Sequence, residues 1–171
     1  EETKQGTKET GTSSEEDDIV VVFVPKLSGN AFFESANVGA QDYAKKVGGY
    51  SVKYDGNPEA SVANQVAIIN NAISQGADAI CVSSVDATGL DAAMKKAMEA
   101  GLAVTTWDSD VGNDARSLMV SQGTPEQLGQ MLVDMAAEGM DDPHAEGITY
   151  CWHYSQATVA DQNSWQVAGE A

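Results

Sequence analysis

Short apolar runs alternate along the chain with longer stretches in which apolar residues recur at helical spacing. Four of the runs predict buried strands, namely Ile19–Val24, Ser51–Tyr54, Ala79–Val82 and Ala103–Trp107. The first run is continuous and rich in β-branched residues, which is typical of a strand covered on both faces. Leu118–Ser121 is a possible fifth strand, and residues 147–154 predict a further strand near the end of the chain.

Amphipathic helices are predicted after these strands, because apolar residues recur there at spacings of three and four. The apolar faces comprise Phe33, Ala36, Ala40, Tyr43 and Val47; Val62, Val66, Ile69 and Ile73; Leu90, Ala93, Met94 and Ala97; and Leu128, Met131, Leu132 and Met135. Gly48, Gly76 and Gly101 are expected to end the first three helices. Thr124 and Gln127 predict a capping box at the start of the fourth. Its methionines lie at helical spacing and are expected in the core.

Strands and helices that alternate with short loops predict an α/β fold, a doubly wound parallel sheet with helices on both faces. Right-handed crossovers would place the carboxyl ends of the strands at one edge, where ligands bind in such sheets. The polar side chains that follow the strands are Lys26, Ser83, Ser84, Asp86, Asp108 and Asp110. We therefore expect the functional site at this edge.

The sequence is strongly acidic, with a formal net charge of −17 over 171 residues. Residues 1–18 contribute −5 of this charge and contain no aliphatic or aromatic side chain, so they predict a disordered acidic tether. The remaining −12 belongs to the globular part and would repel phosphate backbones and anionic lipid. Nucleic acid and membrane surfaces are therefore not expected as partners. No apolar run approaches the roughly 18 residues that a membrane span needs.

Neither a metal ion nor a cofactor is expected. His144 and His153 lack helical metal-ligand spacing, and no CxxC motif or Cys/His cluster occurs. No glycine-rich nucleotide-binding motif follows the first strand. Cys81 and Cys151 lie in apolar, strand-like runs, which predicts buried free thiols rather than a disulfide.

The residues at the sheet edge suit a neutral, hydroxyl-rich ligand. The carboxylates of Asp108 and Asp110 can accept hydrogen bonds from adjacent hydroxyls, and Lys26 can donate one to an oxygen. Trp107 and Phe33 could cover the apolar face of a sugar-like ring, with a place in the core as the alternative for both. The alternative for Lys26 is that it only pairs with Asp108. We expect no catalytic residue. The alternative of another class is a metal-dependent hydrolase that uses Asp108 and Asp110.

Eight short stretches, in order along the chain, match the sequence motifs of a known protein family. They are Phe23–Leu27, Ala31–Phe33, Tyr54–Gly56, Gln65–Asn71, Thr106–Asp110, Gln122–Pro125, Met131–Ala136 and Asp161–Asn163. They resemble the autoinducer-2-binding proteins, which belong to the sugar-type periplasmic solute-binding proteins that serve ABC transporters. The resemblance extends from about Ile19 to the last residue.

The resemblance implies a type I periplasmic binding protein, in which two α/β lobes joined by a hinge close on a cyclic, hydroxyl-rich, furanose-like quorum-sensing signal. It assigns ligand contacts to Lys26, Asp108, Asp161 and Gln162. It also implies an extracytoplasmic location, either periplasmic or as a lipoprotein at the outer face of the cytoplasmic membrane, and an ABC transporter permease as partner. The alternative ligand is a pentose or deoxyhexose sugar.

On this resemblance, residues 19–141 form the first lobe, residues 142–146 a hinge linker, and residues 147–171 the beginning of an incomplete second lobe. Further ligand contacts of the family fall later in the second lobe and have no counterpart here. We therefore expect the 171-residue chain by itself to bind its ligand weakly. We also expect it to self-associate through residues 147–171, where an unpaired strand edge would be exposed.

Overall fold

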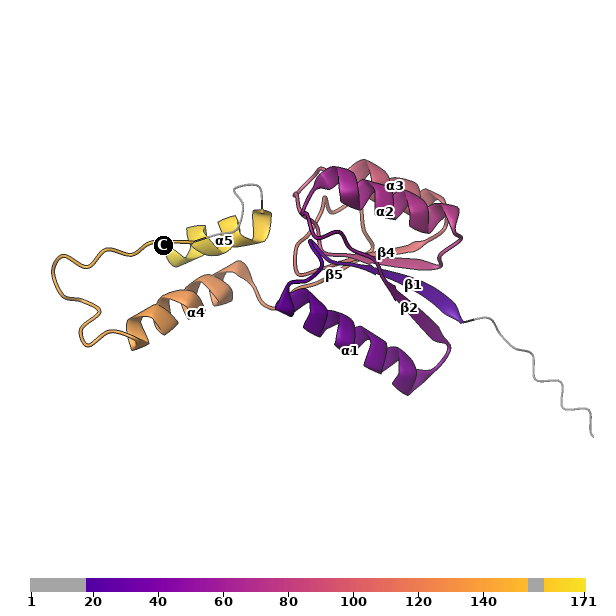
Figure 1. The fold of residues 1–171 in the computed structure, drawn as a ribbon. Coiled ribbons are helices and arrows are strands. Elements are labelled where there is room, and N and C mark those ends of the chain that lie inside the picture. The colour runs from indigo at the N-terminus through magenta and orange to yellow at the C-terminus, as the bar shows by residue number, and fades with distance from the viewer. Residues whose placement is uncertain (1–17, 154–158) are drawn as a thin grey trace, which may run out of the picture.

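The computed structural model describes residues 18–153 and 159–171, and a five-stranded parallel sheet is its main feature (Figure 1). The strands are β1 (Ile19–Val24), β2 (Tyr50–Tyr54), β3 (Ala79–Val82), β4 (Ala103–Trp107) and β5 (Leu118–Val120). The helices are α1 (Ala31–Val47), α2 (Val62–Ser74), α3 (Asp91–Glu99), α4 (Pro125–Glu138) and α5 (Ala160–Gly169). The predicted α/β class is confirmed, and each predicted strand among these five agrees with the structure to within one residue.

The strand order is β2-β1-β3-β4-β5, so the chain reverses its direction across the sheet after β2. Helix α1 covers one face of the sheet, while α2 and α3 lie side by side on the other (Figure 1). The switch in direction falls between β1 and β3. In open sheets of this kind the crevice for a ligand lies there, outside the carboxyl ends of the strands.

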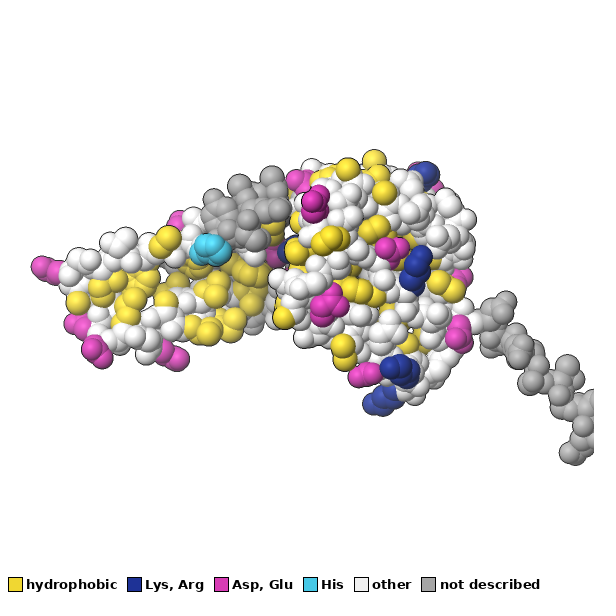
Figure 2. All heavy atoms as spheres, in the orientation of Figure 1, with side chains coloured by type: hydrophobic (Ala, Val, Ile, Leu, Met, Phe, Trp, Pro, Cys, Tyr) yellow, Lys and Arg dark blue, Asp and Glu magenta, His cyan; other side chains and the backbone are white. Residues whose placement is uncertain are grey.

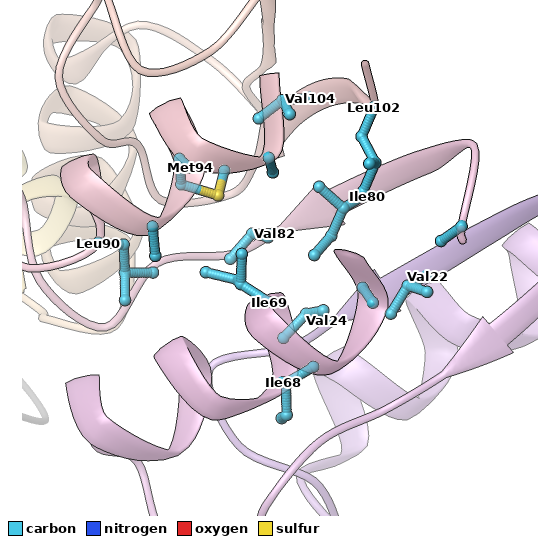
Figure 3. Packing of buried hydrophobic residues seen from close by; sticks show 14 of the residues in the cluster. Val22, Val24, Ile68, Ile69, Ile80, Val82, Leu90, Met94, Leu102 and Val104 are labelled. Carbon is cyan, nitrogen blue, oxygen red and sulfur yellow. The ribbon is translucent and has the colours of Figure 1, made fainter. Parts of the chain in front are cut away.

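The main hydrophobic core lies between the sheet and the α2–α3 face (Figure 3). Its fully buried side chains include Ile69 from α2, Met94 from α3, and Ile80, Val82 and Val104 from the central strands. Burying a side chain of this size is worth about 1.5–3 kcal/mol. Apolar runs at the centre of the sheet therefore fix β3 and β4 and, with them, the loops at their carboxyl ends.

The face that helix α1 buries overlaps the predicted one only in part, since Phe33 is buried as predicted and Ala36 and Ala40 are half-buried. Phe33 and Ala44 are its buried residues, whereas Tyr43 and Val47 are exposed. The side-chain amide of Gln41 donates a hydrogen bond of 2.8 Å to the backbone oxygen of Val52 in β2. An amide that satisfies the strand backbone thus occupies part of the contact with the sheet, and apolar periodicity alone does not predict such a contact.

Helices α4 and α5 pack against each other and project away from the sheet (Figure 1). The capping box of Thr124 and Gln127 begins α4 as predicted. Gly129 of α4 is buried against α5, where an added Cβ would lie 2.5 Å from the backbone oxygen of Trp165. The prediction of a core position for Met131 and Met135 is wrong, since both are exposed. The face of α4 that holds them has no covering layer in the described part of the chain.

The predicted strand at residues 147–154 is absent over residues 147–153, and Tyr154 lies outside the described residues. A strand requires a hydrogen-bonded neighbour, and none of the described strands lies beside this segment. Cys151 is consequently exposed, so the prediction that it is buried is wrong, while Cys81 in β3 is partly buried. Both are free thiols. The predicted tether lies outside the described residues except for Asp18.

An apolar groove of about 480 Å³ lies between α4, residues 147–153 and the end of α5, in the region where yellow side chains gather at the left of Figure 2. Its lining includes Leu132, Val133, Tyr150 and Trp152. Across residues 18–153 and 159–171, every helix falls short of the length and apolar character that a membrane crossing requires.

Candidate ligand-binding site

Lys26 connects the sheet to the α4–α5 unit. Pro25 ends β1 and places Lys26 at the edge of the sheet. The Lys26 ammonium lies 3.0 Å from Oδ2 of Asp108, which follows β4, and 3.2 Å from Oδ2 of Asp161 in the first turn of α5. Only 10%, 7% and 10% of these three side chains is exposed. The sequence predicted all three as ligand residues, and the structure brings them together.

Besides its ion pair with Lys26, the Asp108 carboxylate accepts hydrogen bonds from groups on two other loops. Ser83 Oγ, after β3, donates to Oδ2 at 2.7 Å, beside the Lys26 ammonium. Gln122 Nε2, after β5, donates to Oδ1 at 3.0 Å. Buried charges are stable when they are paired and hydrogen-bonded in this way. The arrangement therefore fixes the position of the Asp108 carboxylate beside Lys26 at this edge of the sheet.

Gln65 joins the loops that hold Lys26 and Ser83. It is a buried residue of α2, and its Nε2 donates to the backbone oxygens of Pro25 at 2.9 Å and Ser83 at 2.8 Å. Its Oε1 accepts from the backbone N–H of Val85 at 3.0 Å. A single side chain thus satisfies three backbone groups and fixes the spacing between the ends of β1 and β3.

Asp110 points into a different network from Asp108. Arg116 binds its carboxylate with two hydrogen bonds, Nε to Oδ1 at 2.9 Å and Nη2 to Oδ2 at 2.7 Å. Thr106 Oγ1 donates to Oδ1 at 2.6 Å. Burial favours the neutral carboxyl, but the hydrogen bonds from Arg116 and Thr106 outweigh it and lower the pKa of Asp110. The hydrogen bond to Asp110 likewise raises the pKa of Arg116.

Aromatic side chains form one wall beside the charged groups. Trp107 stacks on Phe23 with ring centroids 4.6 Å apart and an angle of 12° between the planes. Phe33 meets Trp107 edge to face at 5.7 Å and is buried, so it supports the indole from behind. Phe32 lies 6.4 Å from Trp107 at 22° and is exposed. An apolar ring face could therefore be covered by Trp107 and Phe32, with Phe33 beneath them.

Three buried polar atoms have no hydrogen-bond partner among the described residues, namely Trp107 Nε1, Ser109 Oγ and Asp161 Oδ1. Buried polar atoms are normally paired, so unpaired ones next to a candidate site are consistent with partners that a ligand supplies. Gln162, also predicted as a ligand residue, follows Asp161 in α5 and is partly buried. No group of three or more His, Cys, Asp or Glu side chains that could hold a metal ion occurs within residues 18–153 and 159–171.

Sequence reasoning missed the residues that support the site. Gln65 lies on a helix and Arg116 within a loop, so no strand-end argument selects them. Gln122 follows β5, which the sequence predicted only as a possible strand. One signal was present for Gln65. It is a polar residue inside the apolar stripe of α2, and a polar side chain at a buried helical position requires hydrogen-bond partners.

The fold and the site together define the class of protein. A doubly wound sheet carries the nearly buried ammonium of Lys26 at its switch point. The carboxylates of Asp108, after β4, and Asp161, in α5, enclose it beside an aromatic wall. That donor and acceptor set suits capture of a polar, uncharged solute. The sequence matches the family described as periplasmic binding protein domain over residues 21–170, and the chain belongs to this family of solute-binding proteins.

Solved structures extend the comparison. LsrB from Clostridium saccharobutylicum, in complex with AI-2, is 60% identical, with a TM-score of 0.84 over 89% of this chain and 48% of that one. A solute-binding protein from Burkholderia graminis in complex with D-arabinose is 25% identical, with a TM-score of 0.73 over 90% and 50%. Another, from Clostridium phytofermentans with bound L-rhamnose, is 24% identical and shares the fold, with a TM-score of 0.77 over 90% and 46%. The chain spans about half the length of these relatives.

Proposed function

We propose that this protein is the solute-binding component of an ABC transporter and captures AI-2 (autoinducer-2) between its two units. The observation that carries the proposal is the Lys26 ammonium, held between Asp108 of the sheet unit and Asp161 of the α4–α5 unit. A solute that bonds to all three groups contacts both units and favours their closure. The 60% identity to an LsrB in complex with AI-2 supports AI-2 as the ligand.

In this proposal each side chain has a defined role. Lys26 donates to a ring or hydroxyl oxygen, and Asp108 and Asp161 accept hydrogen bonds from hydroxyls of the ligand. Gln162 adds an amide that can donate and accept. Trp107, supported by Phe33, excludes water from the apolar edge of the ring.

The packing also bears on how the two units divide. Helix α4 packs on α5, so we propose that the crossing between units lies at residues 121–124 rather than at 142–146. Membership of the family implies an extracytoplasmic location. The proposal includes a lipid anchor at the N-terminal end, with residues 1–18 as a spacer. It also includes an ABC transporter permease as partner.

A second candidate ligand is a sugar such as L-rhamnose or D-arabinose, because relatives of the same fold are solved with these sugars. Titration calorimetry of the protein at its full encoded length with AI-2, L-rhamnose and D-arabinose separates the two. We expect AI-2 to bind with a Kd at least tenfold lower than either sugar. Tighter binding of a sugar would replace the first proposal by the second. Turnover of a phosphate ester with Mg²⁺ would overturn both in favour of a hydrolase.

A further inference from the structure

The backbone at Asp108 adopts a conformation that L-residues avoid. Its φ of 62° makes it the one residue other than glycine with positive φ in the described part of the chain. The turn is closed on both sides, since Ser109 N–H donates to Trp107 O at 2.7 Å and Asp108 N–H donates to Val120 O at 3.0 Å. Such a conformation costs free energy and persists only where neighbouring contacts enforce it.

Asp110 and Arg116 supply contacts that enforce this turn. The Asp110 carboxylate is bound to Thr106 Oγ1, in β4 just before the turn, and to the Arg116 guanidinium just before β5. Arg116 Nη2 also donates to Asn113 Oδ1 at 2.7 Å, inside the same loop. The turn at Asp108 is therefore tied to its own strand on one side and to the loop that follows it on the other.

The Asp110 carboxylate has little capacity left for a ligand. A carboxylate offers about four acceptor positions. Two hydrogen bonds from Arg116 and one from Thr106 use most of them. The guanidinium matters for its shape as well as its charge, because a lysine ammonium cannot form the paired, coplanar hydrogen bonds that Arg116 makes. Arg116 is also the only arginine in the sequence.

We propose that Asp110 and Arg116 are positioning residues, whose paired hydrogen bonds hold the turn that aims the Asp108 carboxylate at the ligand. Asp110 itself does not touch the ligand. This inference rests on the proposed function of Asp108 as a ligand contact, and it gives Asp110 a different role from the direct contact expected from sequence.

A double-mutant cycle tests the proposal in the protein at its full encoded length, titrated with AI-2. Asp110→Asn should raise the Kd about tenfold or more, an effect typical of residues that orient a group in direct contact with a ligand. In the Asp108→Ala background the same substitution should change the Kd less than twofold, because the group it positions is gone. Independent, additive losses from the two substitutions would overturn the proposal, since a direct contact or a general loss of fold predicts them.

Arg116→Lys separates the geometry of the pair from its charge. We expect it to weaken binding nearly as much as Arg116→Gln, and full affinity in Arg116→Lys would overturn the role of the paired hydrogen bonds. Asp114→Asn is the matched control, because Asp114 lies in the same loop and forms an exposed ion pair of 2.7 Å with Lys95 of α3. Its affinity should equal that of the parent protein.

The outcomes also distinguish this inference from the proposed function. If Asp108→Ala leaves the Kd for AI-2 unchanged, both fail together. If Asp108→Ala weakens binding but Asp110→Asn does not, the proposed function stands and the positioning role is overturned.

Discussion

At the scale of single residues, Asp108 is the group on which the proposed site depends most. Its carboxylate is bound by side chains from the loops after β1, β3 and β5, those of Lys26, Ser83 and Gln122. Each of these donors could exchange its bond for one to a ligand hydroxyl or share the carboxylate with it. The same group thus orders the site and offers acceptors to a solute.

Asp108→Ala should therefore weaken AI-2 binding by about 2–4 kcal/mol, roughly 30- to 1000-fold in Kd. The physical reason is the loss of a hydroxyl acceptor from a largely desolvated pocket, together with the loss of one of the two carboxylates that pair with the Lys26 ammonium. Titration calorimetry of the full-length protein gives the two Kd values. A larger loss for Asp110→Ala than for Asp108→Ala would contradict this ranking of the two carboxylates.

Sequence reasoning located the charged residues at this scale but not their partners. Lys26 and Asp108 were found because parallel strands end at one edge, and that rule needs only the strand predictions. Gln122 and Arg116 were missed because their roles depend on where a loop folds back, which no periodicity records. Asp110 was predicted as a ligand contact only from its place after β4, whereas its carboxylate is bound to Arg116 and Thr106.

At the scale of elements, the close contact between α4 and α5 depends on a glycine. An added Cβ at Gly129 would lie 2.5 Å from Trp165 O and 2.8 Å from Gly169 N. Both neighbours are backbone atoms, which cannot turn away as a flexible side chain could. The two helices can therefore approach this closely only where α4 lacks a side chain.

Gly129→Ala should separate α4 from α5 and cost about 1–3 kcal/mol of local stability, because overpacking displaces backbone. Hydrogen exchange of the α5 amides should become faster, while exchange in the sheet should not change. Gly39→Ala is the control. An added Cβ at Gly39 in α1 meets nothing within 4 Å, so alanine should stabilise that helix by about 0.5–1 kcal/mol. Unchanged protection of α5 in Gly129→Ala would contradict the prediction.

Strands and helices differ in how well their sequences predicted their surroundings. The continuous apolar runs of β1, β3 and β4 predicted buried strands correctly, because each has partners within the described sheet. The apolar stripe of α4 predicted the helix correctly but not its burial, because burial also needs a covering layer. Residues 147–153 have strand-like composition, yet none of the described strands lies beside them and they form no strand.

At the scale of the whole molecule, exposed apolar side chains on α4 and α5 predict self-association of the 171-residue chain. Met135 is 62% exposed and Val167 is 71% exposed, and both helices border the apolar groove. Large exposed apolar patches commonly mark contact surfaces. The unpaired strand edge expected from sequence is absent over residues 147–153, so these exposed side chains of α4 and α5 replace it as the reason for the prediction.

Sedimentation velocity should show concentration-dependent association of this chain, and Met135→Lys with Val167→Lys should reduce it. Val38→Lys is the matched control, since Val38 is 58% exposed on α1, none of whose residues lines the groove, and its replacement should have no effect. Calorimetry should also show only weak binding of AI-2 to the isolated chain. A monomer that binds AI-2 with micromolar or tighter affinity would contradict both expectations.

The buried cluster of Lys26, Asp108 and Asp161 also bears on the chemical form that the proposed ligand must have. One ammonium between two carboxylates leaves an excess of negative charge, on a protein whose formal net charge is −17. A phosphate ester of the same ring would add like charge at close range, at a cost of about 4 kcal/mol per charge pair 4 Å apart. In competition titrations, the phosphorylated ligand should fail to displace AI-2 even in hundredfold excess. The electrostatics of the site would thus make the protein selective for solutes that no kinase has yet modified.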